Sequence, residues 1–276
     1  MEPISSAANP VVKRMRMLSQ RKHRQRERAA VVHGIQPVRQ AAEAGVELEV
    51  LVVAPSLLRS ESTARFVAEQ RDRGVRVAEV TGELFARLSD RDRPTGLAAI
   101  VLPRSRAADD LVPATGRCTV VALDRVANPG NLGTIIRTAD ATGADGVLLL
   151  GATADPFDPS AIKASMGAIF NVPVARVGDV AEFFSWARRN GIAVATTSAG
   201  AVNSLWHTDY PDRLAFLFGS EGDGLDEDVV RRGDLQVAIP MVGTAESLNL
   251  AVSAGVLLYD RWRAHRPPGQ SRDAAR

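Results

Sequence analysis

The chain contains 276 residues, of which 45% are hydrophobic and 24% charged, with a formal net charge of +2. This composition is typical of a folded globular protein and excludes an intrinsically disordered chain. A single cysteine, Cys118, excludes an internal disulfide framework and a thiolate metal cluster. No apolar run reaches the ~18–20 residues that span a bilayer, and the basic amino terminus lacks a signal-peptide core. We therefore expect a cytoplasmic protein with no membrane partner.

The charges are divided unevenly along the chain. Through Arg106 there are 19 basic and 12 acidic residues, a surplus of seven positive charges, whereas the remainder carries 15 basic and 20 acidic residues, a surplus of five negative charges. Eight of the bases lie within the first 28 residues. Such asymmetry indicates a polyanion partner for the first half, although a solvated helix face accounts for the charges equally well.

Helices and strands alternate in the first half of the chain. Apolar residues at helical spacing predict the helices, and short β-branched runs predict the strands. In chain order we expect helix 10–25, helix 34–44, strand 47–54, helix 60–73, strand 75–80, helix 82–88 and strand 96–102. This order predicts a layered α/β domain over residues 1–105.

The next stretch, residues 103–117, is rich in proline, charge and small side chains, and predicts an interdomain linker at 106–117. Beyond it the strands are almost continuously apolar, which favours a parallel sheet covered on both faces. We expect strands at 119–123, 146–150, 192–197, 214–218 and 236–239, with helices that include 179–190 and about 247–264. The second domain is thus expected at 118–266, followed by a disordered tail at 267–276.

Common catalytic signatures are missing from the sequence. It has no GxxxxGK[ST] phosphate loop, no HExxH and no GxSxG. Its four histidines form no pair at metal-ligand spacing, so we expect no metal site.

Three polar segments follow predicted strands of the second domain, where open α/β sheets bind ligands. They are LDRVANPGNLGTIIRTA at 123–139, FLFGSEGDGL at 216–225 and IPMVGTAESLNLAV at 239–252. Singly, each has a structural explanation. Asn131 and Ser247 suit helix N-caps, and the glycines suit turns. Glu221 suits a solvated loop charge, and Arg137 an ion pair with Asp140. Their occurrence together at strand ends favours a ligand site without specifying its reaction.

In order and spacing, these segments resemble the three signature motifs of the SpoU/TrmH family of RNA 2′-O-ribose methyltransferases, within the SPOUT superfamily. The first matches N-P-x-N-x-G-x-x-x-R-T-A from Asn128 to Ala139, the second matches G-S-E-G-x-G-L at 219–225, and the third matches I-P-M-x-G-x-x-E-S-L-N at 239–249. The stretch KASMGA at 163–168 is also similar. The resemblance therefore covers about residues 118–265.

The first half is similar, over residues 4–28 and 31–38, to the small substrate-binding domain of many family members, whose fold resembles ribosomal protein L30e. His33 stands where that domain usually has a glutamate. The resemblance implies an α/β protein with an L30e-like RNA-binding domain and a SPOUT domain, whose parallel sheet contains a deep trefoil knot. It also implies a homodimer with its active site at the subunit interface.

The resemblance implies S-adenosylmethionine as the cofactor. By motif position, Gly219, Ile239 and Leu248 correspond to the residues that hold it, through backbone groups and apolar contact with adenine. A glycine lets the backbone approach a ligand closely, and branched aliphatic side chains form a flat apolar slot. These types suit the assigned positions.

The family's catalytic positions correspond to Asn131, Arg137, Glu221, Ser247 and Asn249. Methyl transfer requires alignment of the ribose hydroxyl, exclusion of water and loss of the hydroxyl proton. Because a guanidinium with a pKa above ~12 accepts protons poorly, we expect Arg137 to orient the hydroxyl, bind the adjacent phosphate and stabilise the alkoxide. The two asparagines are expected to orient ribose and arginine, the serine to hydrogen-bond, and the glutamate to position partner groups. The general base stays open.

Ribosomal RNA, specifically 23S RNA, is the expected substrate by analogy with relatives that carry the additional domain. Transfer RNA is the alternative substrate, and a catalytically idle RNA-binding module is the alternative class of protein. The presence of all five catalytic positions disfavours the idle module. The target nucleotide, its base and any role in antibiotic resistance stay open.

Overall fold

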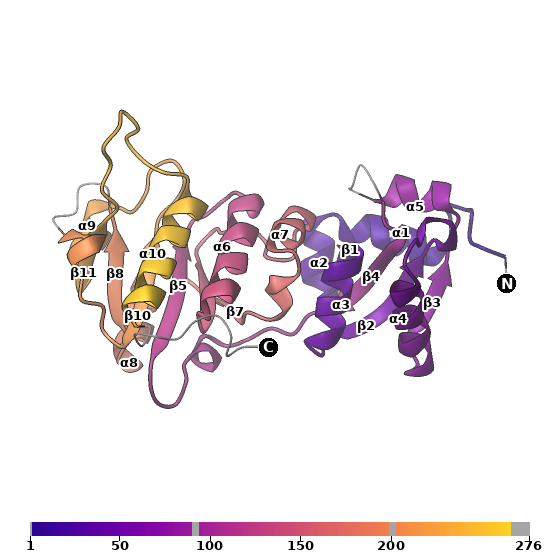
Figure 1. Ribbon diagram of the computed structural model, residues 1–276, viewed down its shortest axis with the longest axis horizontal. Coiled ribbons are helices and arrows are strands. Elements are labelled where there is room, and N and C mark those ends of the chain that lie inside the picture. The colour runs from indigo at the N-terminus through magenta and orange to yellow at the C-terminus, as the bar shows by residue number, and fades with distance from the viewer. Residues whose placement is uncertain (1, 90–93, 199–202, 266–276) are drawn as a thin grey trace. The chain divides into compact units, whose positions relative to one another are not determined.

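The computed structural model describes residues 2–89, 94–198 and 203–265. The chain divides into two compact units, shown in Figure 1. Unit 1 comprises Met1–Ser105 together with Asp155–Asn171, and unit 2 comprises Arg106–Ala154 together with Val172–Arg276. Unit 1 thus contains a segment from the middle of the sequence, Asp155–Asn171. Division of the chain at the expected linker, 106–117, would leave this segment in the second domain. The expected tail, 267–276, lies outside the described residues.

Unit 1 is built on a four-stranded mixed sheet. Its strands are β1 (Ala30–His33), β2 (Glu47–Val53), β3 (Arg76–Glu79) and β4 (Leu97–Leu102). Their order is β1-β4-β2-β3, in which β4 pairs antiparallel with β1 and β2, while β2 and β3 are parallel. The first of these strands was not predicted from the sequence, because four residues are too few to show a clear alternation.

Helices and short 3₁₀ turns cover this sheet. They are α1 (Pro10–Leu18), α2 (Arg21–Glu27), α3 (Ile35–Glu43), η1 (Pro55–Leu57), α4 (Glu61–Asp72) and α5 (Gly82–Leu88). The single helix predicted over 10–25 is wrong: Gln20 has an extended backbone, φ −94° and ψ 131°, and separates α1 from α2. Apolar residues of α1, such as Val12 and Leu18, are fully buried against the sheet core.

The central segment of unit 1 contains α7 (Pro159–Ser165) and η3 (Ala168–Phe170). Its helix begins at Asp158, whose carboxylate accepts a hydrogen bond from the N–H of Ser160 at 3.0 Å. Gly167, with φ +97°, lies against α3, and a Cβ at this position would come 2.0 Å from Oε1 of Gln40. The family-like stretch at 163–168 is therefore packed within unit 1.

Unit 2 contains a seven-stranded sheet in which every pairing is parallel. Its strands are β5 (Cys118–Asp124), β6 (Gly146–Leu150), β7 (Val174–Val177), β8 (Ala193–Thr197), β9 (Asn203–Ser204), β10 (Arg213–Phe218) and β11 (Leu235–Ala238). The order across the sheet is β7-β6-β5-β10-β8-β11-β9. The strongly apolar strands are buried almost throughout, as their composition predicted.

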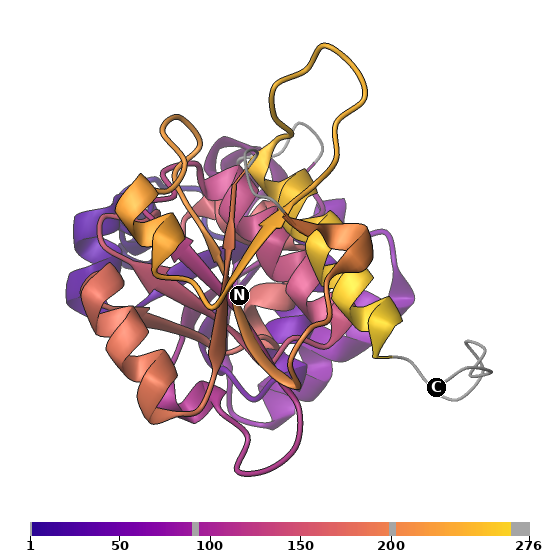
Figure 2. The same ribbon diagram turned by 90° about the vertical axis from the view of Figure 1, so that its left-hand side faces the viewer.

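Helices lie on both faces of this sheet (Figure 2). They are α6 (Pro129–Thr142), α8 (Val180–Arg189), α9 (Glu227–Arg231) and α10 (Leu250–Ala264), with short turns η2 (Ala108–Leu111) and η4 (Leu205–His207). In Figure 2, α10 and α6 cover one face and α8 and α9 the other. Phe183 and Trp186 of α8 belong to a buried core cluster with residues of β5, β6, β8 and β10. Leu111, within the predicted linker, is buried in the same cluster.

The strand order creates a switch point between β5 and β10. From β5 the chain proceeds to β6 on one side, and from β10 it proceeds through α9 to β11 on the other. Ligands of open parallel sheets bind in the crevice at such a point, beyond the carboxyl ends of the strands. The topology therefore predicts a ligand site at the loops that follow β5, β10 and β11. No helix in the described ranges is long and apolar enough to cross a membrane.

Candidate active site

The first motif forms the connection from β5 to α6. The side chain of Asn128 caps α6, accepting hydrogen bonds from the N–H groups of Gly130 at 2.8 Å and Asn131 at 3.2 Å. The structural alternative that made Asn131 the N-cap is therefore wrong, because Asn131 lies inside the first turn. Its amide side chain is consequently available for contacts outside the helix.

The second motif is a tight loop after β10. The N–H of Ser220 donates to the carbonyl of Gly224 at 3.2 Å, and the N–H of Gly224 donates to the carbonyl of Ser220 at 3.1 Å. A Cβ on Gly219 would lie 2.0 Å from the carbonyl carbon of Gly224 and 2.4 Å from the N atom of Leu225. Because these are backbone atoms that cannot rotate away, only glycine permits this loop.

The third motif leads from β11 to α10. The carboxamide oxygen of Asn249 caps α10, accepting hydrogen bonds from the N–H of Ala251 at 2.9 Å and of Val252 at 3.4 Å. The helix begins at Leu250, so the predicted start at 247 and the alternative of Ser247 as its cap are wrong. Ser247 is instead exposed in the loop.

Side chains from the three motifs form one hydrogen-bonded chain. Nδ2 of Asn249 donates to Oδ1 of Asn131 at 3.1 Å, and Nδ2 of Asn131 donates to Oε1 of Glu221 at 3.1 Å. The Glu221 carboxylate also accepts the backbone N–H groups of Ala127 at 3.1 Å and Asn128 at 3.2 Å. Because each amide group has one side engaged as donor and the other as acceptor, the network fixes the orientation of both asparagines.

The same contacts govern the ionisation of Glu221. Burial alone raises the pKa of this carboxyl, but hydrogen bonds from Asn131 and from the backbone at 127 and 128 outweigh it, and the pKa lies below its usual value. The carboxylate is therefore ionised at neutral pH and acts as an acceptor that joins motif one to motif two.

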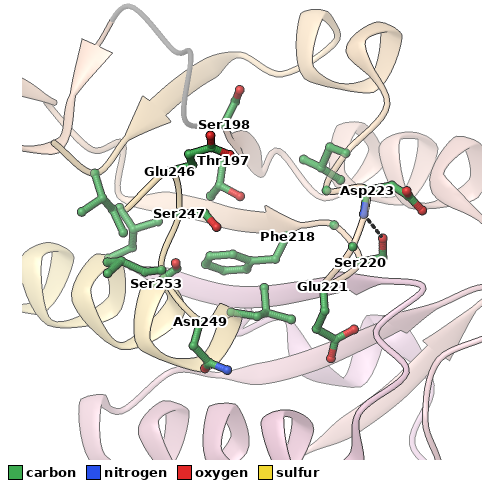
Figure 3. A pocket seen from close by; sticks show the side chains of 18 of the residues that line it. Thr197, Ser198, Phe218, Ser220, Glu221, Asp223, Glu246, Ser247, Asn249 and Ser253 are labelled. Atoms are coloured by element: carbon green, nitrogen blue, oxygen red, sulfur yellow. Dashed lines mark hydrogen bonds between the residues drawn. The ribbon is translucent and has the colours of Figure 1, made fainter. Parts of the chain in front are cut away.

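A cavity of about 560 Å³ opens beside this network. It lies at the carboxyl ends of β8, β10 and β11 and is lined by six of the predicted site residues, namely Gly219, Glu221, Ile239, Ser247, Leu248 and Asn249. In Figure 3 the ring of Phe218 lies between the loop that carries Ser247 and the loop that carries Glu221. All three residues predicted to hold a cofactor thus line one cavity.

Two predicted residues, Asn131 and Arg137, are not among the lining residues of the cavity. Asn131 is joined to the lining by its hydrogen bonds with Glu221 and Asn249. Arg137 lies outside the cavity. Its side chain is exposed on α6, and it forms no hydrogen bond or ion pair with any described residue. The structural alternative for Arg137, an ion pair with Asp140, is therefore wrong. Burial raises the pKa of the Asp140 carboxyl.

Several residues of the site were missed from the sequence. Asn128 shapes the first loop, Phe218 forms part of the cavity floor, and Thr197 lines the cavity at the end of β8. A signal for Thr197 existed, because it ends a predicted strand whose neighbours carry the motifs. Phe218 directly precedes the glycine loop but looks like an ordinary core residue of a strand.

The lining also limits the kinds of ligand that fit. Three carboxylates line the cavity, from Glu221, Asp223 and Glu246, whereas no lysine, arginine or histidine is among the described lining residues. Such a lining suits a positively charged ligand better than a phosphate-bearing one. Within the described residues, no group of three or more histidine, cysteine, aspartate or glutamate side chains is placed to hold a metal ion.

Two family models match the chain. Residues 118–259 match the SpoU rRNA Methylase family, and residues 9–99 match the MRM3-like substrate binding domain. The first match spans the three motifs and ends within α10, and the second spans most of the sheet of unit 1.

Curated and solved relatives agree with these models. The 23S rRNA (guanosine(2553)-2′-O)-methyltransferase RlmP of Bacillus subtilis is 30% identical, over 94% of this chain and 98% of its own. The AdoMet-bound rRNA methyltransferase from Sinorhizobium meliloti is 35% identical with a TM-score of 0.86, covering 96% of this chain and 99% of its own. The AdoMet complex of the SpoU methyltransferase AviRb from Streptomyces viridochromogenes is 30% identical with a TM-score of 0.81, covering 92% and 97%. The chain belongs to the SpoU rRNA methylase family.

Proposed function

We propose that this protein transfers a methyl group from S-adenosylmethionine to a ribose 2′-hydroxyl of ribosomal RNA, specifically 23S RNA. The observation that carries this proposal is the hydrogen-bonded chain from Asn249 through Asn131 to Glu221, which lies at an acidic cavity of about 560 Å³. The names of the relatives, which include a 23S rRNA 2′-O-methyltransferase and AdoMet-bound enzymes, support the same activity.

The cavity suits S-adenosylmethionine in its size, apolar surface and charge. Its volume lies in the range of pockets for small-molecule cofactors. Ile239 and Leu248 offer apolar surface for adenine, and Gly219 permits close approach of the backbone. The carboxylates of Glu221, Asp223 and Glu246 complement a ligand that carries a sulfonium and an ammonium group. When bound, this cofactor supplies a methyl group on a positively charged sulfur.

The chain's own residues must align the ribose, exclude water and assist loss of the proton from its hydroxyl. Asn131 and Asn249, fixed by their mutual hydrogen bond, would present a rigid polar edge to the ribose. The exposed Ser247 would add a hydroxyl hydrogen bond, and Glu221 holds the asparagines in place. Arg137 would bind the neighbouring phosphate and stabilise the developing alkoxide rather than accept the proton.

We also propose a homodimer whose active site lies at the subunit interface. Val252, Tyr259 and Trp262 of α10 are 51%, 50% and 44% exposed and share one face of the helix by their spacing. Such an exposed apolar stripe is typical of a surface that packs against another chain. Because Arg137 does not line the cavity of its own chain, a second chain would bring its Arg137 to that cavity.

Ribosomal RNA is favoured over transfer RNA as the substrate. The substrate-binding domain matched at residues 9–99 and the substrate named for the B. subtilis relative both support this choice. A catalytically idle module is disfavoured because the polar network of the site is complete. A cytoplasmic location would place the protein with ribosomal RNA. The deep trefoil knot and the L30e-like character of unit 1 remain part of the proposal.

The activity is tested with S-adenosylmethionine carrying a labelled methyl group. We expect label in 23S RNA or its assembly precursors, at a ribose 2′-oxygen located by mapping, and much less in transfer RNA. Arg137→Ala should reduce the rate about 10³-fold, or about 4 kcal/mol of barrier, with cofactor affinity unchanged. Arg189→Ala, at an exposed position of α8, serves as the control. Parent-like methylation by Arg137→Ala would contradict the assigned role, and absence of label from every RNA would contradict the activity.

The shared site is tested by mixing two inactive variants. If Arg137→Ala and Gly219→Ala chains form mixed dimers, one of the two sites regains an intact cavity and an intact arginine from the partner. We expect activity to return on mixing. Failure of mixed dimers to regain activity, with exchange of subunits verified, would place both residues in the same subunit's site.

A further inference from the structure

One arginine at the end of β5 has a backbone conformation that arginine rarely adopts. Among the described residues, three other than glycine have a positive φ, namely Arg28, Arg125 and Met166. Arg28 and Met166 end helices, where the left-handed conformation is common. Arg125, with φ +54°, ends no helix and directly follows the last residue of β5. Because glycine would adopt this conformation at lower cost, an arginine here implies a role for its side chain.

The guanidinium of Arg125 is paired with a buried carboxylate. Neighbouring side chains of an extended strand point to opposite faces, but the turn at Arg125 breaks this alternation. Its Nε donates to Oδ2 of Asp124 at 2.8 Å, and the Asp124 side chain is only 5% exposed. The backbone N–H of Arg125 donates to the carbonyl of Leu150 at 3.3 Å. Because a buried carboxylate without a partner is costly, the pair with Asp124 fixes the direction of the arginine side chain.

The same guanidinium reaches a second carboxylate, which follows the second motif. Nη2 of Arg125 donates to Oδ2 of Asp226 at 3.3 Å. Asp226 comes directly after the glycine loop, residues 219–225, and its side chain makes no capping hydrogen bond to α9. An exposed ion pair usually contributes little, in part because two long side chains must be ordered. Here Asp124 already orders the arginine, so the pair with Asp226 costs less conformational entropy.

The glycine loop is therefore attached to the first motif near both of its ends. Near its start, Glu221 accepts two backbone N–H groups of the first motif. Just after its end, Asp226 accepts Nη2 of Arg125. Between these points the loop bonds to itself, as where the N–H of Asp223 donates to Oγ of Ser220 at 3.2 Å (Figure 3). The loop and both attachments belong to unit 2, and loss of either attachment would let the loop change its shape.

We propose that Arg125 is a positioning residue for the cofactor, because it fixes the end of the glycine loop against the first motif. All seven residues of the loop, 219–225, line the cavity. Arg125 is not among the lining residues, so it acts through the loop rather than by contact with a ligand. The identity of the cofactor rests on the proposed function, whereas the link between Arg125 and the loop does not.

The link is tested by hydrogen exchange of the full-length protein without cofactor or RNA. In Arg125→Asn the backbone can keep its left-handed conformation, which asparagine tolerates, but both ion pairs are lost. The amides of Ser220 and Gly224, which pair across the loop at 3.2 and 3.1 Å, should exchange about 5-fold faster than in the parent. Parent-like exchange at both amides in the folded variant would overturn the proposal.

Asp226→Ala covers the case in which Arg125→Asn leaves Asp124 unpaired and fails to fold. It removes only the attachment at the loop, at an exposed side chain, and should raise exchange at the same two amides about 2-fold. Asp228→Ala is the matched control, because it removes an exposed carboxylate from the first turn of α9 that pairs with Arg231. Exchange in the control should stay parent-like. Parent-like exchange in Asp226→Ala, or an equal increase in the control, would overturn the proposal.

Cofactor measurements separate a positioning role from general destabilisation. In Arg125→Asn we expect KM for S-adenosylmethionine to rise about 10-fold and kcat to stay within about 2-fold of the parent, because the hydrogen bond between Asn131 and Asn249 is untouched. A protein that is only destabilised would lose active molecules, which lowers kcat at constant KM, and that result would overturn the positioning role. Faster loop exchange in the variants, with no binding of S-adenosylmethionine to the parent in calorimetry, would support the link and contradict the proposed function.

Discussion

Both units of this protein combine helices with a sheet, but only in unit 2 do the loops that follow the strands lie together at one end of the strands. In unit 1 the sheet is mixed, so the strands run in both directions and the loops that follow them are divided between the two ends of the sheet. In unit 2 every strand pairing is parallel, and the loops after β5, β10 and β11 lie together at the carboxyl ends of the strands. Strand direction therefore decides where segments 90 to 120 residues apart in sequence can form a site, as Asn131 does with Glu221 and Asn249.

The units also differ in what their charged groups do. Unit 1 carries 19 basic and 14 acidic residues, whereas unit 2 carries 15 basic and 18 acidic residues. Exposed bases of unit 1 suit contact with a polyanion, while carboxylates of unit 2 line the cavity or hold its loops. The comparison predicts that changes in unit 2 alter cofactor binding and chemistry, and that surface changes in unit 1 alter RNA affinity.

The largest effect is expected at the glycine loop of unit 2. In Gly219→Ala the new Cβ would meet backbone atoms of Gly224 and Leu225 at 2.0–2.4 Å, so the loop must shift and the cavity must deform. We expect affinity for S-adenosylmethionine to fall about 100-fold, or about 2.7 kcal/mol, measured by titration calorimetry.

Gly222→Ala in the same loop is the matched control. A Cβ at this position meets nothing within 4 Å, and its backbone angles permit an alanine. Its cofactor affinity should stay close to that of the parent. Equal losses in both variants would show that the loop tolerates no change at all, and that the close approach at Gly219 is not the cause.

Much of this fold was predictable from local patterns. Apolar strands such as 146–150 and 214–218 are confirmed at the same bounds or within one residue, because a parallel strand buried on both faces is apolar throughout. The assignment of 155–171 to unit 1 was not predictable, because it depends on the packing of α7 against β1 and of η3 against α3, across more than a hundred residues of sequence. Such contacts leave no periodic signal in a sequence.

The site was predictable to a similar degree. The motifs located Asn131, Glu221 and Asn249, but local preference alone made Asn131 and Ser247 plausible caps. Asn128 and Asn249 cap the helices instead, because each immediately precedes the first helical residue. The sequence also did not predict that Arg137 lies outside the cavity of its own chain, because an exposed position on a helix gives no indication of which site its side chain serves.

An intermediate effect is expected at Glu221. Its carboxylate accepts three hydrogen bonds, and in Glu221→Gln the amide NH₂ would face at least one donor at 127, 128 or 131. We expect methyl transfer at pH 7 to fall about 10-fold, because one hydrogen bond is lost and another contact becomes repulsive. The rate is measured with labelled cofactor under saturating RNA.

The pH dependence of stability gives a second measurement on the same variant. The pKa of Glu221 is below its usual 4.5 in the folded protein, so its contribution is complete above about pH 4.5 and is lost as pH falls through the folded value. The difference in Tm between the parent and Glu221→Gln should therefore be constant from pH 7 to 5 and close at lower pH. A difference that persists unchanged to pH 3 would refute the role of the ionised carboxylate.

The smallest effect is expected on the surface of unit 1, where Arg16 and Arg28 are exposed and form no ion pair with any described residue. Changing both to glutamine should weaken RNA binding about 5-fold at moderate salt. It should also reduce the slope of log affinity against log salt by roughly 1.4–1.8, because two phosphate contacts are lost. Cofactor affinity should not change, since the cavity lies in unit 2.

Arg188 and Arg189 on α8 of unit 2 provide a control of equal charge. Both are exposed and form no ion pair in the described ranges, so Arg188→Gln/Arg189→Gln changes the net charge of the protein by the same amount. If RNA responds only to total charge, the two double variants will show the same salt slope, and the assignment of RNA binding to unit 1 fails. If the slope changes only for Arg16 and Arg28, the position of the charge decides, because counterions are released only where phosphates make contact.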